Sequence, residues 1–236
     1  MPENIRLGGD YIRVRRKKNG ELTYGGDQGF FQWNENRKQD KRKQMSGCGV
    51  VALSDILLYL AGRREACYSE ESVRYAGRIL DEEEYKEYYN SIYELLGGIR
   101  SGNGISGLNL KLKFNKLSRK NNWSLRALWG LNGEKIYIRM EEMLKNDIPV
   151  ILCIPMMLLK KDKNDRLNFY GGKEIQSVNA HYVVVTGVFR KPDGESYLEI
   201  SSWGKKYYIN RNEYDTFIHT HFMGTILGNI LYIRQK

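Results

Sequence analysis

The spacing of hydrophobic residues changes character near the middle of the chain. Residues 46–62 form the most apolar helical segment, with apolar side chains around most of the helix circumference. This pattern is typical of a buried central helix, with Ser46 as its N-cap and Gly62 at its end. Residues 1–45 are expected to form short strands and turns, because glycine pairs punctuate them. A less regular helical spacing of hydrophobic residues predicts further helices over 69–96, 108–121 and 139–146.

Short apolar runs dominate the second half of the chain and predict strands. Lys191–Gly194 reads KPDG, a turn sequence that joins two of these runs into a hairpin. Segregated helices and strands indicate an α+β fold, which we expect to be one domain with a helical lobe over about 1–130 and an antiparallel β lobe over about 131–236. The predicted strands are 150–154, 181–189, 196–203, 205–210 and 229–234.

Composition indicates which broad class of protein the chain belongs to. The chain has 236 residues, of which 41% are hydrophobic and 28% charged, as in ordinary globular proteins. No apolar run is long enough for a membrane span, and no signal peptide is visible. A cytoplasmic location is therefore expected, with a leader removed from the natural protein as the alternative. No feature of the sequence specifies an oligomeric state.

The net charge of +10 raises the question of nucleic-acid binding. The basic residues cluster at 13–18, 37–43 and 160–166, mixed with polar and acidic residues and without interleaved aromatic side chains. Aromatic side chains supply base stacking in single-strand binders, so no nucleic-acid partner is predicted. The three cysteines include no CxxC pair, which argues against a disulfide framework and a cysteine-rich zinc site. No metal or organic cofactor is implied.

A glycine-rich motif, GNGISG at 102–107, matches the GxGxxG pattern of dinucleotide-binding proteins. That pattern requires a preceding strand and an acidic residue about 20 positions later, and neither is present. The motif is therefore interpreted as a loop crossing a substrate cleft or as a turn between helices.

Cys48 stands between Gly47 and Gly49 at the start of the apolar helix. The helix N-terminus presents unpaired N–H groups, which stabilise a thiolate. The two glycines are expected to leave the flanks bare, so that the backbone of another molecule can reach the sulfur. The alternative is a small, inert residue at a tight helix start.

His181 opens a predicted strand and follows Cys48 by 133 residues (181 − 48). This separation falls within the ~130 to 150 residues found in one cysteine-protease architecture. The partner strand of the predicted hairpin ends in ISSWG (200–204). A side chain there is expected to face the start of the His181 strand and to orient the imidazole.

These segments resemble the papain-like cysteine peptidases, and most of all the branch of bacterial peptidases that process double-glycine leaders. The resemblance covers most of the chain and implies a papain-like two-lobed fold with the site between the lobes. The segments that carry it are SGCGVVALSD (46–55), PVILCI (149–154), AHYVVVTGV (180–188) and SSWG (201–204).

The resemblance also implies roles for individual residues. Cys48 corresponds to the nucleophile and His181 to the general base. Ser201 stands where many of these enzymes have asparagine, and serine orients an imidazole less firmly. Gln28 is favoured over Gln32 and Gln44 as the oxyanion donor, because aromatic residues follow it. The residues expected at the substrate cleft are Gly47, Gly49, Ala180 and Trp203, the last also shielding the imidazole.

The sequence therefore predicts a cysteine peptidase that cleaves peptides or proteins through a thioester. Two alternatives remain open. The first is a catalytically weak or inactive papain-fold protein with a binding or regulatory role, suggested by Ser201 in place of asparagine. The second is an amidase or acyltransferase that uses the same thioester chemistry.

Overall fold

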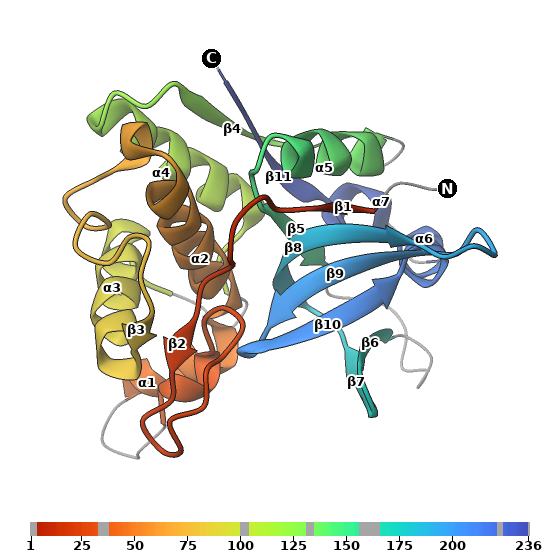
Figure 1. The fold of residues 1–236 in the computed structure, drawn as a ribbon, viewed down its shortest axis with the longest axis horizontal. Coiled ribbons are helices and arrows are strands. Elements are labelled where there is room, and N and C mark those ends of the chain that lie inside the picture. Colours follow the sequence, from red (N-terminus) through yellow and green to blue (C-terminus); the bar gives the residue numbers. More distant parts are fainter. Residues whose placement is uncertain are drawn as a thin grey trace.

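The protein is described by a computed structural model that covers residues 4–32, 38–99, 104–130, 135–155, 166–220 and 224–235. Helices α1 to α4 gather on one side and a curved antiparallel sheet lies on the other (Figure 1), so the predicted α+β class is confirmed. The helices are α1 (Lys38–Ser46), α2 (Cys48–Arg63), α3 (Glu82–Leu95), α4 (Gly107–Lys120), α5 (Ile136–Lys145), α6 (Arg211–His219) and α7 (Gly224–Leu227), with 3₁₀ helices η1 (Gln28–Phe30) and η2 (Glu65–Cys67).

The strands lie mostly in the second half of the chain, with three short ones in the first half. They are β1 (Ile5–Arg6), β2 (Val14–Arg15), β3 (Leu80–Asp81), β4 (Leu125–Trp129), β5 (Val150–Ile154), β6 (Leu167–Gly171), β7 (Glu174–Val178), β8 (His181–Arg190), β9 (Ser196–Ser202), β10 (Lys205–Asn210) and β11 (Ile230–Gln235). The main sheet has the order β4-β11-β5-β8-β9-β10-β6-β7, and β1 pairs with β8. β2 and β3 form a separate parallel pair.

Helix α2 is the central helix of the structure, as its apolar pattern predicted. Leu53, Ile56 and Leu60 on it are fully buried, and it packs against α3 and β8. It begins at Cys48, because the preceding charged segment forms a helix of its own, α1, that ends at Ser46. Lysine, arginine and glutamine are strong helix formers, which explains why this segment is not the expected strand or turn.

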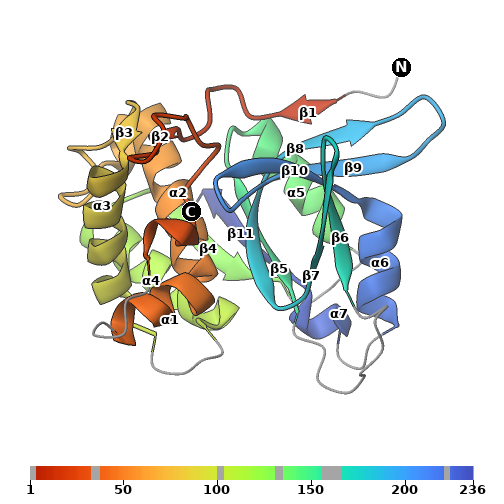
Figure 2. The same ribbon diagram turned by 90° about the horizontal axis from the view of Figure 1, so that it is seen from below.

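Strand β8 lies at the centre of the sheet and carries His181 at its first position. It pairs with β5 through Ile154↔His181 and with β9 through Val184↔Ser201. The predicted hairpin is confirmed, and its turn is closed by a hydrogen bond from the Gly194 N–H to the Lys191 carbonyl (3.0 Å). Figure 2 shows the N-terminal segment running from β1, which pairs with β8 in the sheet, to β2 on the helical side.

Several elements differ from the sequence-based prediction. The helix expected over 69–96 begins only at Glu82, where Asp81 and Glu84 form a capping box. Strands β4, β6 and β7 and helix α6 were not predicted, because their apolar patterns are short or interrupted. One continuous hydrophobic cluster nevertheless runs through both halves of the molecule.

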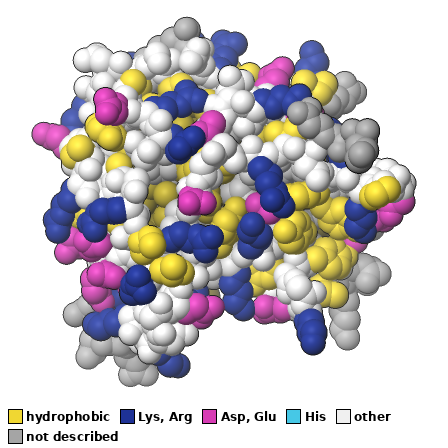
Figure 3. Space-filling model, in the orientation of Figure 1, with side chains coloured by type: hydrophobic (Ala, Val, Ile, Leu, Met, Phe, Trp, Pro, Cys, Tyr) yellow, Lys and Arg dark blue, Asp and Glu magenta, His cyan; other side chains and the backbone are white. Residues whose placement is uncertain are grey.

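The surface and the helix lengths bear on possible partners. Figure 3 shows lysine and arginine side chains spread over one face and interspersed with acidic ones. In the described part of the chain, no single helix is long and apolar enough to cross a membrane. Helices α1 and α2 pass that test only as a pair, which is bent by 75°.

Candidate active site

Cys48, at the start of α2, and His181, at the start of β8, line the same small cavity. The cavity has a volume of about 10 Å³, which is close to the space needed for one water molecule. Gln28, Asp55, Ser202 and Trp203 also contribute to its walls. The structure thus brings together the predicted nucleophile, the predicted base and the favoured glutamine, from three segments far apart in the sequence.

Cys48 occupies the first turn of α2, and its thiol contacts the β8 backbone. Burial raises the pKa of this thiol, and the opposing effect of the backbone N–H groups of Tyr182, Gly49 and Cys48 itself is smaller. The sequence predicted a stabilised thiolate from the helix N-terminus alone. Removal of the sulfur from water outweighs that effect, so the thiol is neutral in the closed site.

The His181 imidazole is held on two sides. Its Nε2 lies 2.8 Å from the Ser202 Oγ, and its ring stacks on Trp203 with centroids 4.5 Å apart and an interplanar angle of 18°. Burial lowers the pKa of His181 to about 3. The imidazole is therefore neutral. Nε2 is thus engaged by Ser202, and Nδ1 has no hydrogen-bond partner among the described residues.

Ser201, which the sequence favoured as the residue orienting His181, has a different partner. Its hydroxyl donates to the Tyr24 carbonyl at 2.7 Å, whereas Ser202 forms the hydrogen bond with the imidazole. Successive side chains of a strand point to opposite faces, so adjacent serines cannot share one role. The structure therefore gives the contact with His181 to Ser202 and gives Ser201 a contact with the N-terminal segment.

Gln28 is the first residue of η1 and faces the Cys48 cavity. Its Nε2 donates to the Gln44 carbonyl at 2.8 Å, so the amide is fixed beside the end of α1. Gln32 is exposed. Of the three candidate glutamines, only the side chain of Gln28 lines the cavity.

The residues expected at the substrate cleft have varied environments. A Cβ on Gly47 would lie 2.2 Å from the Lys43 carbonyl oxygen, and one on Gly49 would lie 3.3 Å from the Tyr182 ring. These flanks are packed against the protein rather than bare, and the lack of a side chain is required by that packing. Ala180 is exposed, whereas Trp203 lines the cavity.

Two residues beside the site have left-handed backbone conformations that side chains rarely adopt. Ala180, directly before His181, has a φ of 52°, and Trp203, directly after Ser202, has a φ of 49°. Such conformations persist only where the surrounding structure enforces them, and they are frequent at functional sites. Both ends of the β8–β9 pair at the site are thus held in fixed geometry.

Asp55 was not singled out from the sequence, yet it lines the same cavity. Its carboxylate accepts hydrogen bonds from the Gly26 N–H (3.0 Å) and from the hydroxyls of Tyr85 (2.7 Å) and Tyr11 (3.1 Å). Burial raises the pKa of this carboxyl to about 6, against the effect of those donors. Its position seven residues after Cys48, on the same helix face, was the available signal.

The other cysteines and histidines lie apart from this chemistry. Cys67 is buried in η2, and burial raises the pKa of Cys153 in β5 to about 12. His219 ends α6, and its neighbour His221 lies outside the described residues. Among the described residues, no group of three or more His, Cys, Asp or Glu could hold a metal ion.

The chain was compared with family models, curated proteins and solved structures. No protein-family model and no curated protein matches the chain. A solved structure described as a C39-like peptidase from Bacillus anthracis is 16% identical, covers 80% of this chain and 90% of its own, and gives a TM-score of 0.41. The bromelain protease from Ananas comosus, solved with the E64 inhibitor, is 11% identical, with full coverage of both chains and a TM-score of 0.39. The chain is similar to these peptidases, as the sequence resemblance predicted.

Proposed function

We propose that the protein is a cysteine peptidase in which Cys48 attacks a peptide carbonyl and His181 carries the proton. One observation supports this most strongly. The Cys48 sulfur accepts the N–H of Tyr182, the residue next to His181, and the thiol and the imidazole line one cavity. A nucleophile and a base on different elements that meet in this way form the basic unit of covalent catalysis.

The proposed reaction starts from a neutral pair. As the Cys48 sulfur bonds to the carbonyl carbon, its proton moves to Nδ1 of His181, and the carbonyl oxygen becomes negatively charged. The amide of Gln28 and the backbone N–H of Cys48 donate hydrogen bonds to that oxygen. His181 then gives its proton to the departing amine as the C–N bond breaks, and water hydrolyses the resulting thioester.

Ser202 supports the base in this scheme. With the Ser202 hydroxyl as acceptor, Nε2 of His181 keeps its hydrogen and Nδ1 is free to take the thiol proton. A hydroxyl can also donate a hydrogen bond, so Ser202 favours this tautomer of His181 less strongly than an amide or a carboxylate would. Trp203 covers one face of the imidazole and reduces competition from water.

A second candidate function is a papain-fold binding protein without turnover. The size of the cavity favours it: about 10 Å³ admits no substrate carbonyl without movement of its walls. In this alternative, peptides bind near Cys48 but no acyl group is transferred to the sulfur.

A mixture of peptides incubated with the parent protein and with the Cys48→Ala variant distinguishes these candidates. New peptide fragments formed by the parent alone support the peptidase. Fragments formed equally by Cys48→Ala contradict it, and peptide binding without fragments supports the binding protein. Cys153→Ala serves as the matched thiol control. An added amine acceptor reports acyl transfer, because the product then carries the amine in place of a new carboxylate.

A further inference from the structure

The N-terminal segment that carries Gln28 is hydrogen-bonded to the β turn that carries Trp203. The Tyr24 N–H donates to the Gly204 carbonyl at 2.8 Å, and the Gly204 N–H donates to the Gly26 carbonyl at 3.0 Å. Gly25 has a φ of 81°, and a Cβ on it would lie 2.2 Å from the Ser201 hydroxyl oxygen. The segment therefore fits closely between α2 and the end of β9.

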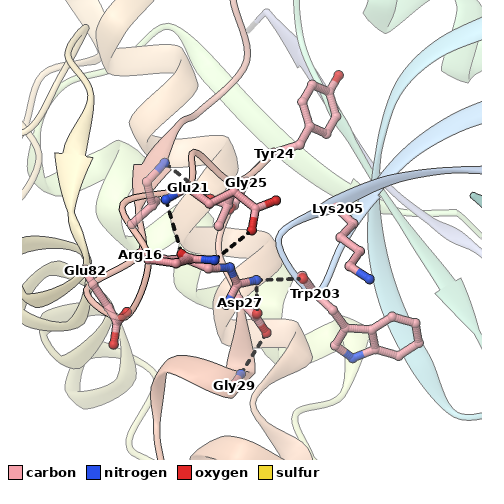
Figure 4. A network of polar contacts seen from close by, with 12 residues as sticks. Arg16, Glu21, Tyr24, Gly25, Asp27, Gly29, Glu82, Trp203 and Lys205 are labelled. Atoms are coloured by element: carbon pink, nitrogen blue, oxygen red, sulfur yellow. Dashed lines mark hydrogen bonds and ion pairs between the residues drawn. The ribbon is translucent and has the colours of Figure 1, made fainter.

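An ion pair secures this contact (Figure 4). Arg16 Nη2 donates to Asp27 Oδ2 at 2.6 Å and lies 3.5 Å from the Trp203 carbonyl oxygen. The other Asp27 oxygen accepts the Gly29 N–H at 2.7 Å and so caps η1. The Asp27 side chain is only 9% exposed and that of Arg16 25%, so water screens this pair less than a surface pair.

The two ends of this ion pair reach opposite halves of the site. Asp27 immediately precedes Gln28, the proposed oxyanion donor, and its cap defines the start of the turn that presents the amide. Arg16 contacts Trp203, whose ring stacks on His181 and whose φ of 49° needs support. One guanidinium therefore contacts both the segment before Gln28 and the backbone of the residue that covers the imidazole.

We propose that Arg16 and Asp27 are positioning residues that hold Gln28 and Trp203 in a fixed relation across the site. This inference rests on the proposed peptidase function for its catalytic consequence. The structural coupling itself does not depend on that function. Neither residue touches the reacting atoms.

Conservative variants separate the effect of the Arg16–Asp27 ion pair from the effect of the Asp27 N-cap on η1. Asp27→Asn keeps an oxygen for the Gly29 N–H, since asparagine is also a good N-cap, but loses the charge that pairs with Arg16. Arg16→Gln removes the cation. Lys191→Gln removes a cation from the exposed Lys191–Glu195 pair at the far hairpin turn and is the charge-matched control.

Two reagents separate thiol reactivity from oxyanion stabilisation. Iodoacetamide forms an S–C bond with Cys48 as the C–I bond breaks; iodide leaves, the thiol proton passes to solvent, and no oxyanion develops. A dipeptide aldehyde adds reversibly to Cys48: the S–C bond forms and the thiol proton passes to the aldehyde oxygen, which lies at the oxyanion position. Asp27→Asn and Arg16→Gln are expected to weaken aldehyde binding roughly 10- to 100-fold, while iodoacetamide rates stay within about twofold. In a Gln28→Ala background the same changes should cause no further loss.

Hydrogen exchange of the Gly204 amide provides a readout independent of catalysis. Arg16→Gln and Asp27→Asn are expected to accelerate it, although Gly204 lies in neither variant's own segment; Lys191→Gln should not. Unchanged Gly204 exchange, or aldehyde losses that persist in the Gln28→Ala background, overturns the proposal. A parent protein that binds no aldehyde shows that the peptidase proposal has failed, and the exchange result then decides the coupling alone.

Discussion

Ser202 Oγ and His181 Nε2 lie 2.8 Å apart, and this hydrogen bond engages one of the two imidazole nitrogens. In the proposed reaction, the other nitrogen, Nδ1, takes the Cys48 proton. The bond also restricts rotation of the ring, together with the stacked Trp203. Orientation of the His181 imidazole therefore comes from the last residue of β9 and the turn that follows it.

Replacement of Ser202 tests this relationship. A neutral hydrogen bond contributes about 1 kcal/mol, so Ser202→Ala is expected to slow acylation of Cys48 by roughly three- to tenfold. Ser201→Ala removes a bond to the Tyr24 carbonyl and should have the smaller effect. Acylation rates with an activated peptide ester measure both. A larger loss in Ser201→Ala would instead support the role predicted from the sequence.

His181 should make the protein less stable in acid. Its pKa is lowered from 6.5 to about 3 by burial, so below pH 6.5 the unfolded chain binds a proton that the folded protein does not. The stabilisation is complete above pH 6.5 and is lost as the pH falls toward 3. Between pH 7 and 5 the parent should lose about 2 kcal/mol more free energy of unfolding than His181→Gln. Urea unfolding at both pH values measures this; equal losses would show that the histidine is not buried as described.

Asp55 should have the opposite dependence. Its pKa is raised from 3.8 to about 6, so the folded protein holds a proton between those values that the unfolded chain has released. The associated stability is present below pH 3.8 and is lost as the pH rises through 6. Relative to Asp55→Asn, the parent should lose about 2 kcal/mol between pH 4 and 7. A difference that does not change with pH would contradict the buried carboxyl.

Gln28 is expected to act on the rate rather than on binding. Gln28→Ala should lower kcat for a cleaved peptide by about 10²- to 10³-fold, as removal of one oxyanion donor does elsewhere. Gln32→Ala, which changes an exposed glutamine nearby, is the control and should behave like the parent. If Gln28→Ala raises KM with kcat unchanged, the residue binds substrate and does not stabilise the oxyanion.

Parts of the fold followed directly from the sequence. Strands β5 and β10 have their predicted bounds and the β8–β9 hairpin forms as expected, because β-branched runs and the KPDG turn are local signals. The boundary between α1 and α2 could not be predicted from the sequence, since a charged helical segment and a charged loop have similar compositions. Helix periodicity could have identified Asp55, two turns after Cys48.

Features of the site that depend on tertiary packing were beyond the sequence. The exchange of roles between Ser201 and Ser202 follows from the strand register, which includes a shift between Val185 and Gly187. A one-residue difference moves a side chain to the other face of the sheet. The neutral state of Cys48 and His181 likewise follows from burial, which the helix N-terminus alone does not reveal.

Transfer of an acyl group to Cys48 tests the central claim most directly. An activated peptide ester is mixed with the parent, Cys48→Ala and His181→Ala, and intact mass follows the thioester with time. We predict an adduct that maps to Cys48, is absent from Cys48→Ala, and forms at least about 10²-fold more slowly in His181→Ala, in keeping with general-base catalysis. Acylation of Cys48 at the same rate in the parent and in His181→Ala would contradict the proposed catalytic pair.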